Sequence, residues 1–207
     1  MGGRLIGMWL MLGAAGALDS PTDWSRLARE IHSETNLLRV DPAGYAAHLE
    51  RMLPRFEGRL LARPGRANLR TDEGAPAVRE AIAALKKRRP VPQLRWSKGL
   101  SAAAADHVRD QGPIGGLEHR GSDRSDPARR ASRHGRWLRA MAENIAYGDN
   151  AARNVVIQLL VDDGVPGRGH RENLLDPGWG AAGVACGPHR EYRQMCVMDY
   201  AVKYAER

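Results

Sequence analysis

Helical periodicity fills the first two thirds of this chain, and strand-like runs are confined to its end. Amphipathic helices are predicted from Trp24 to Leu38 and, after a cap at Asp41-Pro42, as far as Met52. A short helix around Val78 to Leu85 and a longer one capped by Ser97 follow. Helices and strands do not alternate in the βαβ manner, so this order predicts an α+β fold with helices packed on an antiparallel sheet.

The remaining segments are predicted to be two loops, one further helix and a terminal hairpin. Residues Pro54 to Gly74 are rich in Gly, Pro and Arg, and we expect a surface excursion there. An irregular polar loop is expected from Gly116 through Arg136. A helix is predicted from about Asn150 to Asp163, followed by a brief turn or helix at Gly169 to Leu175 and then by the hairpin.

Two cysteines, Cys186 and Cys196, lie in short apolar runs on either side of a turn region at Pro188 to Glu191. The runs predict the two strands of the hairpin. In an oxidising compartment the thiols would form a bridge between these strands, and two reduced, buried thiols are the alternative. A metal site made by this pair is disfavoured because the usual close ligand spacing is missing.

The N-terminus is typical of a secretory signal peptide. Arg4 precedes an apolar stretch from Leu5 to Ala15, and the small residues Ala15-Gly16-Ala17 place the expected cleavage after Ala17. An uncleaved membrane anchor is the competing interpretation, but about a dozen apolar residues fall short of the roughly 20 that span a bilayer. No later segment is apolar enough to cross a membrane, so we expect an exported, soluble mature chain, extracellular or periplasmic.

The positive charge of the chain is spread out. The formal net charge is +8, yet the arginines are interleaved with acids along the sequence. Only one aromatic residue, Trp137, lies near the densest basic cluster, between Arg124 and Arg139. This pattern disfavours nucleic acid as a partner.

A small set of histidines and acids has surroundings unlike those of a solvated face: His119, Glu143, Asp162 or Asp163, and His170. Glu143 lies near the apolar Ile145, and the aspartates end a helix whose other inward positions are valine and leucine. Carboxylates at such places need partners, because an unpaired buried charge is unstable. Two imidazoles with two carboxylates can ligate a divalent cation or exchange protons without one. For each residue alone, a structural hydrogen bond is the alternative.

Several phrases, in order, resemble motifs of the CAP superfamily, also known as the SCP or pathogenesis-related-1 type, in its bacterial secreted form. Glu143-Asn144-Ile145 resembles the Glu-Asn-Ile/Leu motif, and Gly169-His170-Arg171-Glu172-Asn173-Leu174-Leu175 resembles the Gly-His-Arg-x-Asn-Ile/Leu phrase. Leu100 to His107 is similar to the Leu-x-x-x-Ala-x-x-His helix, and Gly183-Val184-Ala185 to Asp199-Tyr200-Ala201 is similar to the closing strands.

The resemblance implies a fold and a division of the chain. The expected fold is an α-β-α sandwich with an antiparallel sheet between helical layers. The CAP domain would cover residues 24–203. The signal peptide would occupy 1–17, a short segment 18–23, and a C-terminal tail 204–207.

The resemblance also implies a cleft lined by two histidines and two acids. Carried over residue by residue, His119 is the first histidine, Glu143 the first acid and His170 the second histidine. The second acid departs from the eukaryotic Val-x-x-Trp-Tyr-x-Glu pattern. If Val156 is the valine, leucines replace both aromatic residues and Asp162 replaces the glutamate, which leaves Asp162 and Asp163 as alternatives.

The implied function is a secreted binding module. Its cleft would bind a divalent cation, with zinc favoured, at His119, Glu143, Asp162 and His170. Its surfaces would bind a lipid or a cell-envelope component. The alternative is a metal-dependent hydrolase that uses the same cleft, with Glu143 as base. The signatures of the common zinc proteases and serine hydrolases are missing. An envelope-associated scaffold is a third class, which needs no cleft. The ligand and the oligomeric state are left open.

Overall fold

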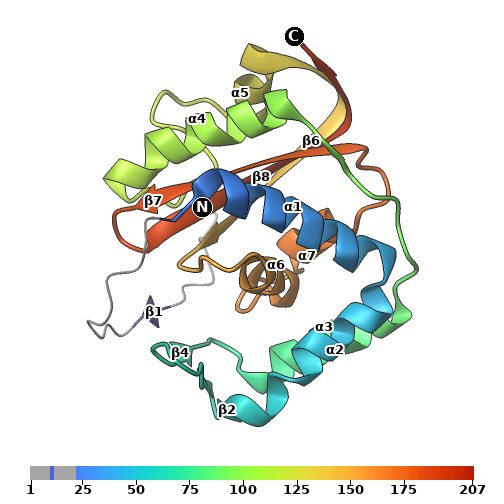
Figure 1. Cartoon of the computed structure of the whole chain (residues 1–207), viewed down its shortest axis with the longest axis vertical. Coiled ribbons are helices and arrows are strands. Elements are labelled where there is room, and N and C mark those ends of the chain that lie inside the picture. Colours follow the sequence, from blue (N-terminus) through green and yellow to red (C-terminus); the bar gives the residue numbers. More distant parts are fainter. Residues whose placement is uncertain (1–9, 12–21) are drawn as a thin grey trace.

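The computed structural model describes residues 10–11 and 22–207 (Figure 1). Apart from residues 10–11, the predicted signal peptide therefore lies outside the described residues. That pair forms strand β1 (Leu10–Met11), which is antiparallel to β4 (Leu69–Arg70). Within the described ranges, no helix combines the length and the apolar character that crossing a membrane requires.

A four-stranded sheet forms the middle layer. Its order is β5 (Arg95–Trp96), β7 (Ala181–His189), β8 (Arg193–Glu206) and β6 (Gly135–Tyr147). Strands β7 and β8 are the predicted hairpin, and β6 pairs antiparallel with β8. The short edge strand β5 runs parallel to β7. Strand β6 is the opposite edge.

Helices cover both faces of this sheet, as Figure 1 shows. On one side lie α4 (Lys98–Ile114) and α5 (Pro127–His134). On the other side lie α1 (Trp24–Val40), α6 (Ala152–Val161) and α7 (Gly169–Leu175). The fold is therefore the expected α-β-α sandwich.

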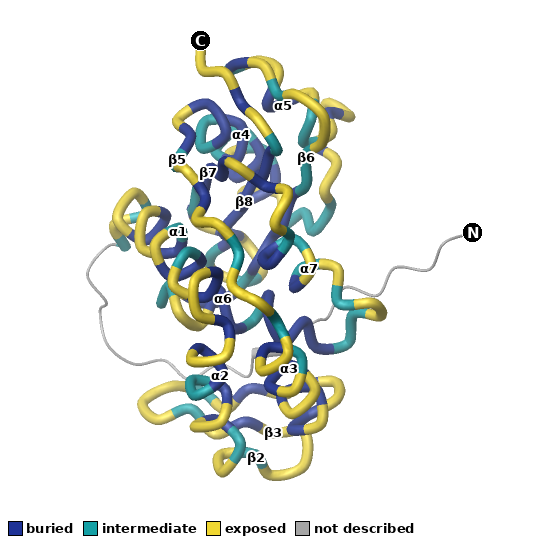
Figure 2. Tube along the Cα trace, turned by 90° about the vertical axis from the view of Figure 1, so that its right-hand side faces the viewer, coloured by how far each residue is buried: buried dark blue, intermediate teal, exposed yellow. Residues whose placement is uncertain are grey.

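Strand β8 shows how the two apolar layers arise from one sequence. Successive side chains of a strand point to opposite faces. Val197 and Ala201 join the apolar clusters beneath α4, whereas Met198 and Tyr200 join the large cluster shared with α1 and α6. Figure 2 shows the resulting burial along β7 and β8.

Helix α4 lies very close to β7 because that strand presents glycine at two points of contact. A Cβ atom on Gly183 would lie 2.1 Å from the backbone nitrogen of Ser101. A Cβ atom on Gly187 would lie 2.5 Å from Cγ1 of Val108. The close approach therefore depends on the absence of a side chain at both positions.

A disulfide joins Cys186 of β7 to Cys196 of β8. The two cysteines face each other directly in the register of the hairpin. The bridge confirms the first of the two alternatives for these residues.

Residues Pro54 to Gly74, which we refer to as the excursion, contain short strands. Helix α2 (Pro42–Glu50) leads into a 3-10 turn η1 (Leu53–Arg55), then into β2 (Phe56–Glu57), β3 (Leu60–Leu61) and β4. With β1 they form a small sheet in the order β1-β4-β3-β2, and α3 (Ala75–Lys87) follows. Most residues of the excursion are exposed, as the yellow tube in Figure 2 shows, but Leu61 and Leu69 are buried.

The irregular loop predicted through Arg136 is wrong over its second half. Helix α5 begins at Pro127, where Asp126 accepts a hydrogen bond from the backbone N–H of Arg129, and strand β6 begins directly after the helix. This helix lacks an apolar stripe, since its buried residues are Ala131 and Arg130.

Candidate functional site

The first histidine–acid pair is formed by His119 and Glu143. Glu143 lies on β6, two residues before Ile145, and Ile145 packs in the apolar cluster beneath α4. His119 comes from the loop that follows α4, and its Nδ1 lies 2.8 Å from Oε1 of Glu143. The carboxylate is almost wholly buried, whereas 54% of the imidazole side chain is exposed. A buried acid thus holds a histidine that faces solvent.

Arg130 of α5 is the second partner of Glu143. Its Nη2 donates to Oε2 of Glu143, and its Nη1 donates to the carbonyls of His119 and Ser125. Burial alone raises the pKa of the Glu143 carboxyl, but the hydrogen bond from His119 and the charge of Arg130 outweigh it, so the pKa lies below its usual value. Glu143 is therefore ionised at neutral pH and accepts hydrogen bonds.

The second pair is formed by Asp162 and His170. Asp162 ends α6 in the left-handed region, at φ +53°. Its Oδ1 lies 2.6 Å from Nδ1 of His170, and its Oδ2 accepts a hydrogen bond from the backbone N–H of the same histidine at 2.9 Å. The carboxylate is buried and the imidazole is partly exposed. This pair repeats the arrangement of the first.

Asp163, the alternative second acid, has a different role. Its two carboxylate oxygens accept hydrogen bonds from the backbone N–H groups of Asp72 and Glu73, at 2.6 and 3.0 Å. Burial raises the pKa of Asp163, and these hydrogen bonds oppose the rise. The structure thus places Asp162, not Asp163, beside His170.

Ion pairs of Arg168 and Arg171 with Glu73 and Glu80 fix the segment around His170. We refer to these ion pairs as the clamp. Arg168 donates to the carbonyl of Asp162 and to the carboxylate of Glu73. Arg171 makes two hydrogen bonds to Glu80 and one to the carbonyl of Leu160. The clamp joins the second pair to α3 and to the end of the excursion.

The two pairs adjoin the same edge strand from opposite faces. Asn144 follows Glu143 on β6, so its side chain points to the other face of the sheet. Its Nδ2 donates to the carbonyl of His170 at 3.0 Å, and its Oδ1 accepts from Nδ2 of Asn173 at 2.9 Å. Within residues 22–207, no three His, Cys, Asp or Glu side chains are grouped closely enough to hold a metal ion. The structure therefore shows two pairs rather than one cluster of four.

Asp199 is a buried acid that the sequence reasoning did not include. It lies directly opposite Glu143 in the register of β6 and β8, and it is fully buried. Burial, followed by the charge of Glu143, raises the pKa of Asp199 well above its usual value, which favours the neutral form. The sequence does contain a signal for its burial. Asp199 lies two residues from both Val197 and Ala201, so in a strand it shares their inward face.

Two other residues of this region complete the picture. Arg130 was missed because it lies in the segment predicted as a loop. His107 is fully buried on α4, where its Nε2 lies 2.8 Å from the carbonyl oxygen of Glu118. Burial lowers its pKa. It is a core histidine.

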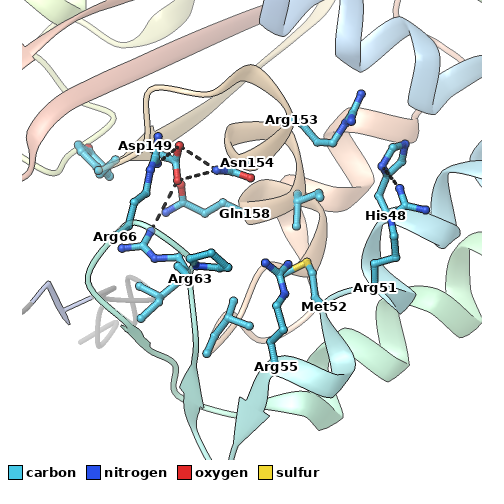
Figure 3. A pocket seen from close by; sticks show the side chains of 16 residues that line it. His48, Arg51, Met52, Arg55, Arg63, Arg66, Asp149, Arg153, Asn154 and Gln158 are labelled. Atoms are coloured by element: carbon cyan, nitrogen blue, oxygen red, sulfur yellow. Dashed lines mark hydrogen bonds and ion pairs between the residues drawn. The ribbon is translucent and has the colours of Figure 1, made fainter. Parts of the chain in front are cut away.

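One pocket lies away from both pairs, between α2, the excursion and α6, as Figure 3 shows. Its volume is about 400 Å³. None of the four predicted cleft residues lines it.

Comparison with known proteins gives one family match. The model of the family described as "CAP: Cysteine-rich secretory protein family" matches residues 35–200. No curated protein matches the chain.

This chain is also similar to three solved structures. An extracellular protein containing a SCP domain from Bacillus anthracis is 20% identical, with a TM-score of 0.43, over 55% of this chain and 35% of that one. An outer surface protein from Borrelia burgdorferi is 16% identical, with a TM-score of 0.46, over 56% and 80%. NaASP2, solved with Zn²⁺, is 14% identical, with a TM-score of 0.45, over 91% of both chains. This chain thus spans about a third of the Bacillus protein, and similarities this low carry no argument about function.

Proposed function

Because the chain belongs to the Cysteine-rich secretory protein (CAP) family, we propose that it is a secreted binding module whose cleft takes a divalent cation. The two histidine–acid pairs would form the walls of the cleft, and the ligand of the module would be a lipid or a cell-envelope component. The CAP domain would extend over residues 24–203.

The observation that supports the cation is the same in both pairs: each histidine directs its Nδ1 to a buried carboxylate. Histidines that bind metals almost always donate their other ring N–H to a carboxylate, a carbonyl or a water molecule. In the first pair, ionised Glu143 has no proton to donate, so Nδ1 of His119 carries the hydrogen. Its Nε2 then has a lone pair available for a metal ion.

On this proposal Glu143 and Asp162 orient the imidazoles, and His119 and His170 supply the ligand atoms. Zinc suits such nitrogen ligands, and water or a bound ligand would fill the remaining positions. Since no metal-holding group of three is present among residues 22–207, the cation has to draw the two walls together. The exposed loop position of His119 permits such a movement.

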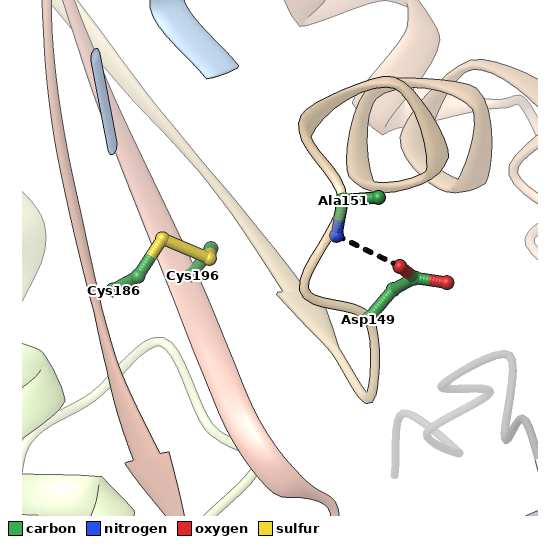
Figure 4. The surroundings of a disulfide bond; sticks show 4 residues. All are labelled: Asp149, Ala151, Cys186 and Cys196. Carbon is green, nitrogen blue, oxygen red and sulfur yellow. Dashed lines mark hydrogen bonds between the residues drawn. A yellow bond between two sulfur atoms is a disulfide. The ribbon is translucent and has the colours of Figure 1, made fainter. Parts of the chain in front are cut away.

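Export is the second part of the proposal. The disulfide between Cys186 and Cys196, drawn in Figure 4, fits an oxidising compartment, where such bridges persist. The signal peptide expected at residues 1–17 gives the route. Cleavage after Ala17 leaves all residues of the two pairs in the mature protein.

Zinc binding by tag-free protein tests the cleft. Isothermal titration should show binding to the wild type, and zinc should raise its melting temperature, because a ligand that binds only the folded state stabilises it. Both effects should be lost in the double variant His119→Ala/His170→Ala. Absence of binding heat and of any thermal shift in the wild type would contradict the proposal.

His134→Ala is the matched control. His134 also pairs with a carboxylate, since its Nε2 lies 2.7 Å from Oδ2 of Asp106, but it belongs to neither pair. This variant should bind zinc like the wild type. An equal loss in the control and in the double variant would mean that zinc binds elsewhere.

A further inference from the structure

The pocket between α2, the excursion and α6 has a size suited to a small ligand. Its volume of about 400 Å³ lies within the range of about 300 to 1,000 Å³ that is common for ligand pockets. The end of α2 and the start of α6 form two of its sides, and the excursion forms another, as Figure 3 shows. The pocket is separate from the two histidine–acid pairs.

Positive charge dominates the lining. Among the residues that line the pocket, one bears a carboxylate, Asp149, and five are arginines: Arg51, Arg55, Arg63, Arg66 and Arg153. In Figure 3 these arginines come from several sides of the pocket. The imbalance gives the pocket a field that attracts anions.

The single carboxylate, that of Asp149, already has partners. Oδ1 of Asp149 lies 3.0 Å from Nη1 of Arg66, and it also accepts a hydrogen bond from the backbone N–H of Ala151, drawn in Figure 4. Arg63 lies 3.7 Å from the other oxygen. Arg153 pairs outside the lining, with Glu34 at 2.7 Å. Asp149 therefore cannot neutralise the remaining arginines.

Of the five arginines in the lining, Arg51 and Arg55 have no carboxylate partner among the described residues, whereas the other three do. Nη2 of Arg51 lies 2.7 Å from Nδ1 of His48. Burial, followed by the charges of Arg153 and Arg51, lowers the pKa of His48, so this imidazole is neutral at neutral pH and accepts the hydrogen bond. The two guanidinium groups therefore have no negative partner, and most of their hydrogen-bond donors are available to a ligand.

Buried apolar side chains also line the pocket. Met52 follows the end of α2, Ile157 lies within α6, and Leu61 and Leu69 come from the excursion. An inorganic anion would leave this apolar surface unused. An uncharged apolar molecule would leave the arginines without partners.

From this combination we propose that the pocket binds an organic anion, a phosphate monoester or carboxylate joined to an apolar group. Arg51 and Arg55 bind the anion, since guanidinium groups bind phosphate and carboxylate through paired hydrogen bonds. The apolar group lies against Met52, Leu61 and Ile157. The inference rests on the proposed binding function and names its ligand class, but its site shares no residue with the zinc test.

Titration with three probes separates the contributions: hexyl phosphate, inorganic phosphate and 1-hexanol. Hexyl phosphate should bind to the purified protein at least tenfold more tightly than inorganic phosphate, because each buried methylene strengthens binding about fourfold. It should also bind at least tenfold more tightly than 1-hexanol, because the alcohol has no charged group for Arg51 and Arg55 to bind. Equal binding of hexyl phosphate and inorganic phosphate would overturn the inference. Failure of hexyl phosphate to bind would also overturn it, even if zinc binds.

The double variant Arg51→Gln/Arg55→Gln tests the residues. Both side chains belong to exposed residues, so the fold should persist. Hexyl phosphate should bind about tenfold more weakly, with zinc binding unchanged. The control Arg79→Gln/Arg136→Gln removes the same charge at two exposed positions outside the pocket. It should bind hexyl phosphate within about twofold of the wild type, and an equal loss in both double variants would overturn the assignment.

Vesicles distinguish the source of the anion. Hexyl phosphate binding together with cosedimentation on vesicles containing phosphatidic acid, and loss of both in Arg51→Gln/Arg55→Gln, supports the site with a membrane headgroup as its source. Hexyl phosphate binding without cosedimentation supports the site with a free organic anion. Cosedimentation of the wild type and the double variant alike, with no binding of hexyl phosphate to the wild type, overturns the inference.

Discussion

At the scale of single residues, the first pair depends on two neighbouring acids that differ in charge. Glu143 is held ionised by His119 and Arg130, whereas Asp199, opposite it, favours the neutral form. A neutral carboxyl beside an ionised one avoids two buried negative charges. The sequence alone suggested His119 but not Arg130 or Asp199. Arg130 lies in a segment predicted as a loop, and the phrase that contains Asp199 indicated a strand rather than an acid of the cleft.

Asp199→Asn should flatten the dependence of stability on pH. The folded pKa of Asp199 is raised, so its contribution to stability is full below the unfolded value of about 3.9 and falls as pH rises toward the folded value. Within that window each pH unit lowers the free energy of unfolding by about 1.4 kcal/mol. Urea unfolding from pH 4 to 8 measures the slope, with the exposed Asp123→Asn as control. The same slope in wild type and variant would contradict the prediction.

Asp162 combines a left-handed backbone with two hydrogen bonds to His170. Asp162→Ala should lower the free energy of unfolding by about 1 to 3 kcal/mol, because alanine is strained at positive φ and makes neither bond. Asp162→Asn should lower the free energy of unfolding by less, since asparagine tolerates this conformation and its carbonyl still accepts the hydrogen bond from the backbone N–H. Chemical unfolding of both variants gives the comparison. A larger loss for asparagine than for alanine would count against it.

At the scale of elements, apolar periodicity decided what could be predicted. Helices α1 and α4 carry regular apolar faces and were recognised, as was the hairpin with its two cysteines. Helix α5 was missed because it buries an arginine and an alanine. Strand β6 was missed because its register shifts between Leu138 and Met141, which interrupts the alternation.

Gly183→Ala should separate α4 from β7. The new Cβ would lie 2.1 Å from a backbone atom, which cannot rotate away as a flexible side chain can. Overpacking of this kind usually lowers the free energy of unfolding by about 1 to 3 kcal/mol. Gly169→Ala is the control, because a Cβ there meets nothing within 4 Å. Thermal unfolding of both variants would show whether the close approach matters.

At the scale of the whole molecule, the family match over residues 35–200 and the sandwich agree with the expectation from a few short phrases. Those phrases indicated Glu143 and His170 as cleft residues, but not which residue pairs with which. They could not predict the pocket, because it is built by the excursion, which has no periodicity, together with the end of α2 and with α6. Tertiary contacts between distant segments, rather than any local pattern, create it.

Export should produce a shorter chain. Protein recovered from the medium or the periplasm should begin at Leu18, because the expected cleavage follows Ala17. Intact mass and N-terminal peptide mapping give the first residue directly. Accumulation of chains that keep residues 1–17 in the membrane fraction would instead indicate the anchor.

The clamp has a thermodynamic consequence for any pair of ligands. Glu73 and Glu80, at the excursion and on α3, hold Arg168 and Arg171 beside the second wall. A ligand that moves the excursion therefore also shifts the position of His170. Reciprocity then applies: whatever factor an organic anion imposes on zinc affinity, zinc must impose on the affinity for that anion. The double variant Glu73→Gln/Glu80→Gln breaks these ion pairs. The change in zinc affinity that the anion causes, compared between this variant and the wild type, would show how much of the coupling depends on them.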